Sequence, residues 1–101
     1  MNIEELTQRL HRIRDNNDWK QFHAPKNLAM AASVEMAQLV EIFQWLTEEQ
    51  SHQLLPSKLA PAGQEAGHIV MYLPLLCSEL GLALDQVVRS KLADSERRFA
   101  K

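Results

Sequence analysis

The sequence predicts an all-α protein with four helices joined by short links. Apolar residues recur at intervals of three and four, no segment shows the alternation typical of strands, and proline, glycine or polar runs separate the periodic segments. The 101 residues, 46% of them hydrophobic, fit a single domain over 1–101. A helical chain this short often completes its core by oligomerising, so we expect a homo-oligomer.

The first helix is expected to begin after Asn2 and to run to about Arg14. Asn2 followed three positions later by Glu5 is the pattern of an N-cap and its capping-box partner. The apolar residues that follow keep helical spacing: Ile3, Leu6, Leu10 and Ile13. The polar run 15–18 then ends the helix and turns the chain.

The second helix is expected over 25–46, because Pro25 suits a first helical turn. Thr47 and the two acids after it could cap a short helical turn that reaches Leu55. The stretch 56–63 contains two prolines and a glycine, so we expect it to be a loop.

The third helix is expected to begin near Pro61 and to stop at about Leu80, because Gly81 suits the position just past a helix end. A fourth helix begins at Asp85 or a neighbouring residue. Its apolar residues fall on one side: Leu84, Val88, Leu92 and Phe99.

Composition narrows the possible partners and the compartment. The net charge of −2 offers no basic field for nucleic acid, and the longest apolar run, 69–77, is too short to span a bilayer. The charged, amphipathic N-terminal stretch is unlike a secretory signal. The single cysteine, Cys77, cannot form an internal disulfide. We therefore expect a cytoplasmic protein that binds neither membrane nor nucleic acid.

The second expected helix has an acid where a core residue would be expected. On a wheel of about 100° per residue, Glu35 falls in the middle of the apolar stripe formed by Leu28, Leu39, Ile42 and Leu46. A carboxylate there is costly unless it is paired, protonated or bound to a cation. The simpler alternative is an acid at a packing position whose stem reaches solvent.

The third expected helix repeats this anomaly. Glu65 shares a face with Ile69, Tyr72 and Leu76. A polar residue follows each acid by three positions, Gln38 after Glu35 and His68 after Glu65. Residues three apart are neighbours on a helix surface, so all four converge if the two helices pack face to face. Facing pairs of this kind are how helix bundles build metal sites.

Four stretches agree, in order, with the motifs of one family: WKQFHAPKNLAMA from Trp19, E-x5-E-I-F-Q-W over 35–45, E-x3-I-V-M-Y-L from Glu65, and KLADSERRF over 91–99. Over about 11–99 the chain resembles the MazG-like all-α nucleoside triphosphate pyrophosphohydrolases, most closely their short dCTP-pyrophosphatase-type branch. The resemblance implies a four-helix protomer that forms a helix bundle between the subunits of a homodimer or homotetramer. It also implies Mg²⁺-dependent hydrolysis of a nucleoside triphosphate to the monophosphate and pyrophosphate, a house-cleaning activity.

The family's signature is E-x-x-E on one helix and E-x-x-D on the next. Glu35 and Glu65 match it, whereas Gln38 and His68 replace the other two acids. Mg²⁺ prefers oxygen ligands, and a histidine nitrogen suits transition metals such as Zn²⁺ or Mn²⁺ better. The metal is therefore different, the site is weaker, or catalysis is lost, and Gln38 and His68 are either metal ligands or a neutral hydrogen-bonded pair. Glu41, one turn beyond Gln38, could compensate in part.

The resemblance further implies a nucleobase pocket enclosed by aromatic residues and one histidine: His11, Trp19, Trp45 and Tyr72. The alternative for the three rings is ordinary aromatic core. The basic residues near the end of the chain are available for phosphate oxygens or form a solvated face that suits the helix dipole: Lys91, Arg97 and Arg98.

Two functions follow from this reading. In an enzyme, a metal held by Glu35, Gln38, Glu65 and His68 would act on the phosphates, and an acid among Glu35, Glu65 and Glu41 would serve as general base. In a non-catalytic relative, the chain would bind a nucleotide or serve as a structural oligomer without hydrolysis. The preferred base, the metal and the choice between dimer and tetramer lie beyond the sequence.

Overall fold

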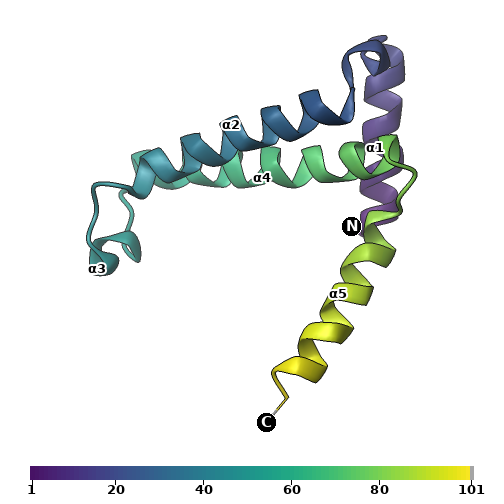
Figure 1. Cartoon of the computed structure of the whole chain (residues 1–101). Coiled ribbons are helices and arrows are strands. Elements are labelled where there is room, and N and C mark those ends of the chain that lie inside the picture. The colour runs from purple at the N-terminus through teal and green to yellow at the C-terminus, as the bar shows by residue number, and fades with distance from the viewer. Residues whose placement is uncertain (101) are drawn as a thin grey trace.

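The computed structural model describes residues 1–100, and these residues form helices and connecting turns with no strand. The two longest helices, α2 (Pro25–Phe43) and α4 (Pro56–Glu79), lie side by side and form the most extensive pairing in the chain. Figure 1 shows α1 crossing one end of this pair, the short α3 at the other end, and α5 leading away from it. The all-α prediction is confirmed.

The first helix, α1 (Ile3–Asn16), begins as expected, because the Asn2 side chain accepts a hydrogen bond of 2.7 Å from the Glu5 backbone nitrogen. Its apolar face differs from the prediction at one position. Ile13 is exposed, and Arg14 takes its place in the interior, one turn after Leu10. The Arg14 guanidinium is held by Asp15 at 2.9 Å and lies 3.9 Å from Glu79, so its charge is partnered where it is buried.

A 3₁₀ turn, η1 (Lys20–Phe22), connects α1 to α2. Pro25 starts α2 as expected, whereas the helix ends at Phe43, three residues before the predicted end. Thr47 then caps α3 (Glu48–Ser51) through a capping box with Gln50. The predicted short turn is present, although it ends before Leu55.

The predicted loop over 56–63 is wrong, because α4 already begins at Pro56. Pro56 occupies the first helical position, where a missing N–H costs nothing, and Leu55 before it is extended. Pro61 lies inside the helix and forgoes one hydrogen bond, which the rest of a 24-residue helix tolerates. The other end matches the prediction: Gly81 has a φ of +73°. The amides of Gly81 and Leu82 bond back to Ser78 and Cys77.

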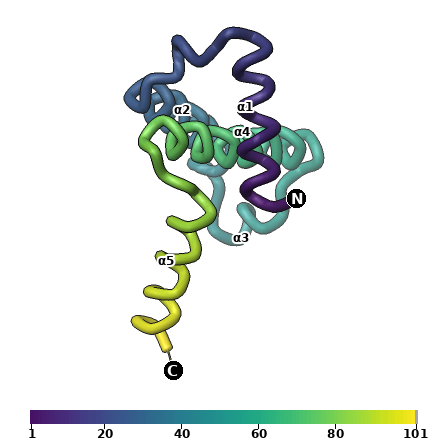
Figure 2. The backbone as a smooth tube through the Cα atoms, turned by 90° about the vertical axis from the view of Figure 1, so that its right-hand side faces the viewer, coloured from purple at the N-terminus to yellow at the C-terminus, as the bar shows by residue number. Residues whose placement is uncertain are grey.

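The last helix, α5 (Leu84–Arg98), contacts the ends of α4 and α1 and extends away from them (Figures 1 and 2). The apolar residues predicted on its one side are largely exposed, among them Val88, Leu92 and Phe99. Among residues 1–100, no single helix is long and apolar enough to cross a bilayer. Only α4 and α5 together reach that composition, as a pair bent by 105°.

The hydrophobic core is small and lies where α1 crosses α2 and α4. Three leucines, one from each of these helices, form its buried centre: Leu10, Leu28 and Leu75. Leu6, Tyr72 and Leu76 pack against them. The radius of gyration is 16.3 Å, against about 13 Å for a compact domain of 100 residues. The single chain is therefore open, and its core is confined to one end of the α2–α4 pair.

Candidate metal and nucleotide site

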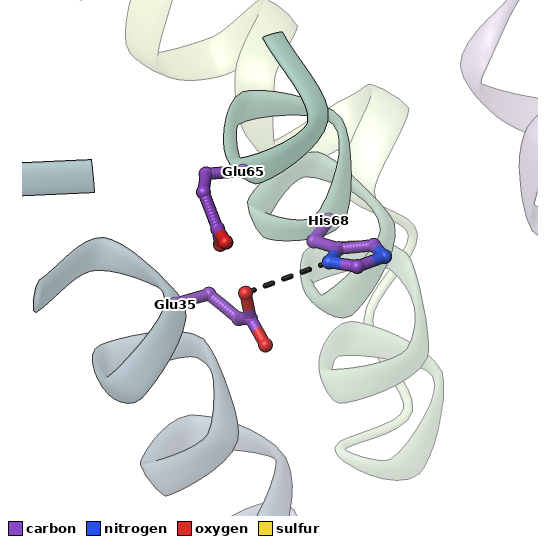
Figure 3. Close-up of side chains that lie close together, drawn as sticks. All are labelled: Glu35, Glu65 and His68. Atoms are coloured by element: carbon purple, nitrogen blue, oxygen red, sulfur yellow. Dashed lines mark ion pairs between the residues drawn. The ribbon is translucent and has the colours of Figure 1, made fainter. Parts of the chain in front are cut away.

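The candidate site lies on the seam between α2 and α4. Glu35 projects from α2, and Glu65 and His68 project from α4 one helical turn apart. Figure 3 shows the two carboxylates turned toward each other and the imidazole turned toward Glu35. One donor atom from each of the three side chains lies within 4.8 Å of the other two. The predicted convergence of these residues is present in the structure.

Glu35 is the central residue of this group. Its side chain is only 19% exposed, and its Oε2 atom lies 3.5 Å from Nδ1 of His68. The His68 ring is 59% exposed, so the group is buried on the Glu35 side and reaches solvent through the imidazole. Glu35 and Glu65 therefore do not extend independently into water, as the simpler alternative would require.

Gln38 connects the two acids. In the amide orientation that pairs donors with acceptors, its nitrogen donates to Glu65 Oε1 at 3.0 Å, to Glu65 Oε2 at 3.3 Å and to Glu35 Oε2 at 3.2 Å. The amide therefore occupies the space between the carboxylates and offsets part of their repulsion. All four residues predicted from the two helices meet at one point.

The two carboxyl groups are not equivalent. A hydrogen bond with Glu35 raises the pKa of Glu65 above its ordinary value, with partial burial and the charge of Glu35 acting in the same direction and His68 opposing them. The pair thus holds a proton more readily than two separate acids would. A divalent cation would relieve the same repulsion, and two carboxylates with an imidazole form a donor set that fits such an ion.

Glu41 lies outside this group. It is exposed on α2, and the donor atoms that gather within 4.8 Å come from Glu35, Glu65 and His68. Its predicted part in compensating for Gln38 has no structural counterpart in the single chain.

The predicted base-binding residues are divided between three places. Trp19 and Tyr72 line one cavity of about 250 Å³ beside the core, together with Arg14 and His23. His11 lies in a neighbouring cavity, where its Nε2 atom is 2.9 Å from Ser78 Oγ. Burial, together with the charge of Arg14, lowers the pKa of His11 below its ordinary value.

Trp45 is 87% exposed and follows the end of α2, at the opposite end of the helix pair from the cavity between Trp19 and Tyr72. The single chain therefore does not bring it to the other predicted base-binding residues. A large ring left this exposed is typical of a contact surface rather than of a folded core.

The predicted phosphate-binding residues lie together on α5, apart from the acids. Lys91 and Arg97 border an open hollow of about 780 Å³ and both pair with Asp94, at 3.8 Å and 3.3 Å. The Arg98 guanidinium stacks 5.6 Å from the centre of the Phe99 ring. Within one chain these cations do not meet the Glu35–Glu65 pair, because α5 leads away from α2 and α4 (Figure 2).

Two polar side chains of the Trp19 cavity were not predicted as site residues. Arg14 is buried there, and His23 has its Nδ1 atom buried without a hydrogen-bond partner. For Arg14 a signal existed, since it follows Leu6 and Leu10 at intervals of four. No pattern marked His23, which enters the cavity through the η1 turn rather than through a periodic element.

The all-α fold and the carboxylate–imidazole group between two helices place this chain among the helical proteins that build a candidate metal site between helices. The chain is 34% identical to dCTP pyrophosphatase 1 of Bos taurus and 33% identical to dCTP pyrophosphatase 1 of Homo sapiens, in each case over 100 residues and 96% of this chain. The chain spans 58–59% of the length of these relatives. No family model matches it.

The crystal structure of a pyrophosphatase from Archaeoglobus fulgidus superposes with a TM-score of 0.86 at 33% identity, covering 97% of this chain and 92% of that one. The chain therefore belongs to the MazG-like all-α pyrophosphatases, and it is similar to the dCTP pyrophosphatase 1 branch.

Proposed function

We propose that this chain is a metal-dependent nucleoside triphosphate pyrophosphohydrolase of the house-cleaning type. It would convert a deoxynucleoside triphosphate and water to the monophosphate and pyrophosphate. The observation that carries the proposal is the convergence of Glu35, Glu65 and His68 across the α2–α4 seam in a chain of the pyrophosphatase family. A cytoplasmic location stays a prediction from the sequence.

A divalent ion held by Glu35, Glu65 and His68, Mg²⁺ by resemblance to the family, would neutralise phosphate charge and lower the pKa of a bound water. Glu35 or Glu65 would act as general base, and the raised pKa of Glu65 brings that carboxyl closer to the neutral pH at which a base is most effective. Gln38 would orient both acids through its amide nitrogen. Glu41 is a weaker candidate for the base, since it lies outside the group.

The cavity between Trp19 and Tyr72 supports the proposal of a nucleotide ligand, whose base it would hold. The cavity of about 250 Å³ is smaller than the about 300–1,000 Å³ of pockets that enclose a whole drug-sized ligand, so it suits a single ring system. Aromatic faces stack on any base, and edge hydrogen bonds add selectivity. Arg14, His23 and the neighbouring His11 are the polar groups available for such bonds.

The remaining predicted residues need a second copy of the chain. The accessible surface is 7943 Å², whereas a compact monomer of 11.6 kDa exposes about 5,800 Å². The excess of about 2,100 Å² is comparable with the area lost at an obligate interface. We propose a homodimer or homotetramer in which Trp45, Lys91, Arg97 and Arg98 approach the site of a neighbouring copy, the cations meeting the phosphates of the bound nucleotide.

One observation favours the second function, a non-catalytic nucleotide-binding or structural relative. In the amide orientation that pairs donors with acceptors, the Gln38 nitrogen donates to both acids, so a neutral side chain of the protein itself offsets part of their repulsion. In that case the protein would bind nucleotides without hydrolysing them.

The direct test is to incubate the purified full chain with each deoxynucleoside triphosphate and Mg²⁺, Mn²⁺ or Zn²⁺, and to measure monophosphate and pyrophosphate. The proposal expects equal amounts of both products with at least one ion. Nucleotide binding without turnover under every condition, by protein with an intact helical spectrum, would establish the non-catalytic function instead. Activity gained only after Gln38→Glu with His68→Asp would identify a degenerate enzyme.

A further inference from the structure

The donor atoms on the α2–α4 seam are not all oxygens. Glu35 and Glu65 supply carboxylate oxygens, and His68 supplies Nδ1, which already faces Glu35 at 3.5 Å (Figure 3). All three donor atoms lie within 4.8 Å of one another. Ligands of one ion at about 2.0–2.2 Å from it lie somewhat closer than that, so a shared ion requires only small side-chain adjustments.

Gln38 has a different contact when no ion is bound. In the amide orientation that pairs donors with acceptors, its nitrogen donates to both acids at 3.0 to 3.3 Å, and the amide oxygen then points away from the space between them. To act as an oxygen ligand, the amide would have to reverse and lose all three bonds. The groups ready to bind an ion are therefore two carboxylates and one imidazole.

This donor set discriminates between ions. Mg²⁺ requires near-ideal octahedral oxygen coordination and gives up its waters reluctantly. Imidazole nitrogen suits the later transition metals, whose affinity for a mixed nitrogen and oxygen site rises from Mn²⁺ toward Cu²⁺. A set of three protein ligands also leaves open the position that a catalytic zinc-type ion keeps for water or substrate.

We propose that Glu35, Glu65 and His68 form a site selective for a transition-metal ion of the Co²⁺, Ni²⁺ or Zn²⁺ class over Mg²⁺. The proposal rests on the proposed function only in using the same site, and ion preference can be measured without substrate. His68 is the residue that sets the preference. Its exposure of 59% leaves the ring free to turn Nδ1 from the Glu35 carboxylate toward an ion that both share.

The test uses metal-free full-length protein dialysed against Zn²⁺ with Mg²⁺ in large excess, followed by metal analysis. Three proteins are compared: wild type, His68→Asp, and His52→Asp as a matched control on an exposed histidine outside the group. Wild type and the control should retain Zn²⁺. His68→Asp should lower the ratio of Zn²⁺ to Mg²⁺ affinity by at least about tenfold, since even losing a group that only supports a ligand costs that much.

A second measurement uses wild-type protein, so it does not depend on whether His68→Asp folds. In wild-type protein, Zn²⁺ should shift the ring nitrogen NMR signals of His68 and leave those of His52 unchanged. The proposal is overturned if Mg²⁺ is retained in preference to Zn²⁺, if His68→Asp leaves the affinity ratio unchanged, or if the His68 signals do not move.

These outcomes separate the two proposals. Zn²⁺ retention with no hydrolysis under any ion would refute the proposed function and leave the metal site standing. Hydrolysis supported by Mg²⁺ together with no preference for Zn²⁺ would refute the metal selectivity and leave the function standing.

Discussion

The two halves of the α2–α4 seam differ in what holds them together. Near α1, the seam is closed by buried apolar side chains, with Leu28 only 3% exposed. Toward the other end, the same two helices meet through Glu35, Gln38, Glu65 and His68, which are joined by hydrogen bonds and an ion pair. The apolar half is covered by a third helix, whereas the polar half remains open to solvent. The buried apolar core thus lies in one half of the seam, and the candidate metal site lies in the other.

The largest expected effect comes from the polar half. Glu35→Gln keeps the shape of the side chain and removes a carboxylate that would serve as ion ligand or as general base. We expect hydrolysis to fall by at least about 10²-fold, with little change in thermal stability, as measured by pyrophosphate release and melting temperature. Glu49→Gln, which neutralises an exposed acid on α3, should retain activity. Equal activity of Glu35→Gln and wild type would remove Glu35 from the mechanism.

Substitutions in the apolar half should instead lower the stability of the protein. Leu28→Ala opens a cavity in the three-leucine core and should lower the free energy of unfolding by about 2–5 kcal/mol. Leu28→Met, which conserves volume, should cost less than about 1.5 kcal/mol. Urea denaturation measures both variants. A loss for Leu28→Ala no larger than for Leu28→Met would contradict the assignment of the core to this end.

A third variant tests whether a second copy covers the open half. Val40 lies on α2 beyond Gln38 and is 48% exposed in the single chain. Val40→Asp should raise the dissociation constant of the oligomer by at least about tenfold, because a charge in an apolar interface loses its hydration, whereas Val40→Ile should preserve the assembly. Sedimentation equilibrium measures the constant. A monomeric wild-type protein at all concentrations would show that the exposed surface is not an interface between copies.

The smallest effect is a pH dependence near the covered half. The pKa of His11 in the folded chain lies below its ordinary value. The unfolded chain therefore binds more protons than the folded chain as the pH falls through that ordinary value, and stability decreases. The free energy of unfolding of wild type should therefore drop more between about pH 8 and about pH 5 than that of His11→Gln. His52→Gln serves as the control. Parallel pH profiles for wild type and His11→Gln would show that His11 is not the group responsible.

The same contrast explains how far the sequence was informative. The polar half was predictable, because acids in an apolar stripe are costly and each had a polar neighbour three residues later. The helix start at Asn2 and the end at Gly81 were predictable for the same kind of reason, since each uses a specific backbone interaction.

The errors arose where a local signal had two physical meanings. Proline marks both a loop and a first helical turn, and at Pro56 the second applies, so α4 begins earlier than expected. The predicted first helix ends at about Arg14 and assigns that residue no place in the core, yet its charge is partnered by Asp15 and Glu79 and so can be buried. The contact with Glu79 joins residues far apart in the chain, which no local pattern reveals. Trp45 and the α5 cations do not reach the acids within one chain, and the sequence of one chain does not place the neighbouring copy that we propose for them.

The central claim is that Glu35 and Glu65, from two helices, share one metal ion. The most direct test is a double-mutant cycle of metal affinity with Glu35→Gln, Glu65→Gln and the double variant, measured by calorimetry with the ion that wild type binds most tightly. If the acids share an ion, the double variant should lose less binding energy than the two single losses added together, with a coupling of about 0.5–3 kcal/mol. Losses that add within about 0.3–0.5 kcal/mol would show two independent acids and contradict the account.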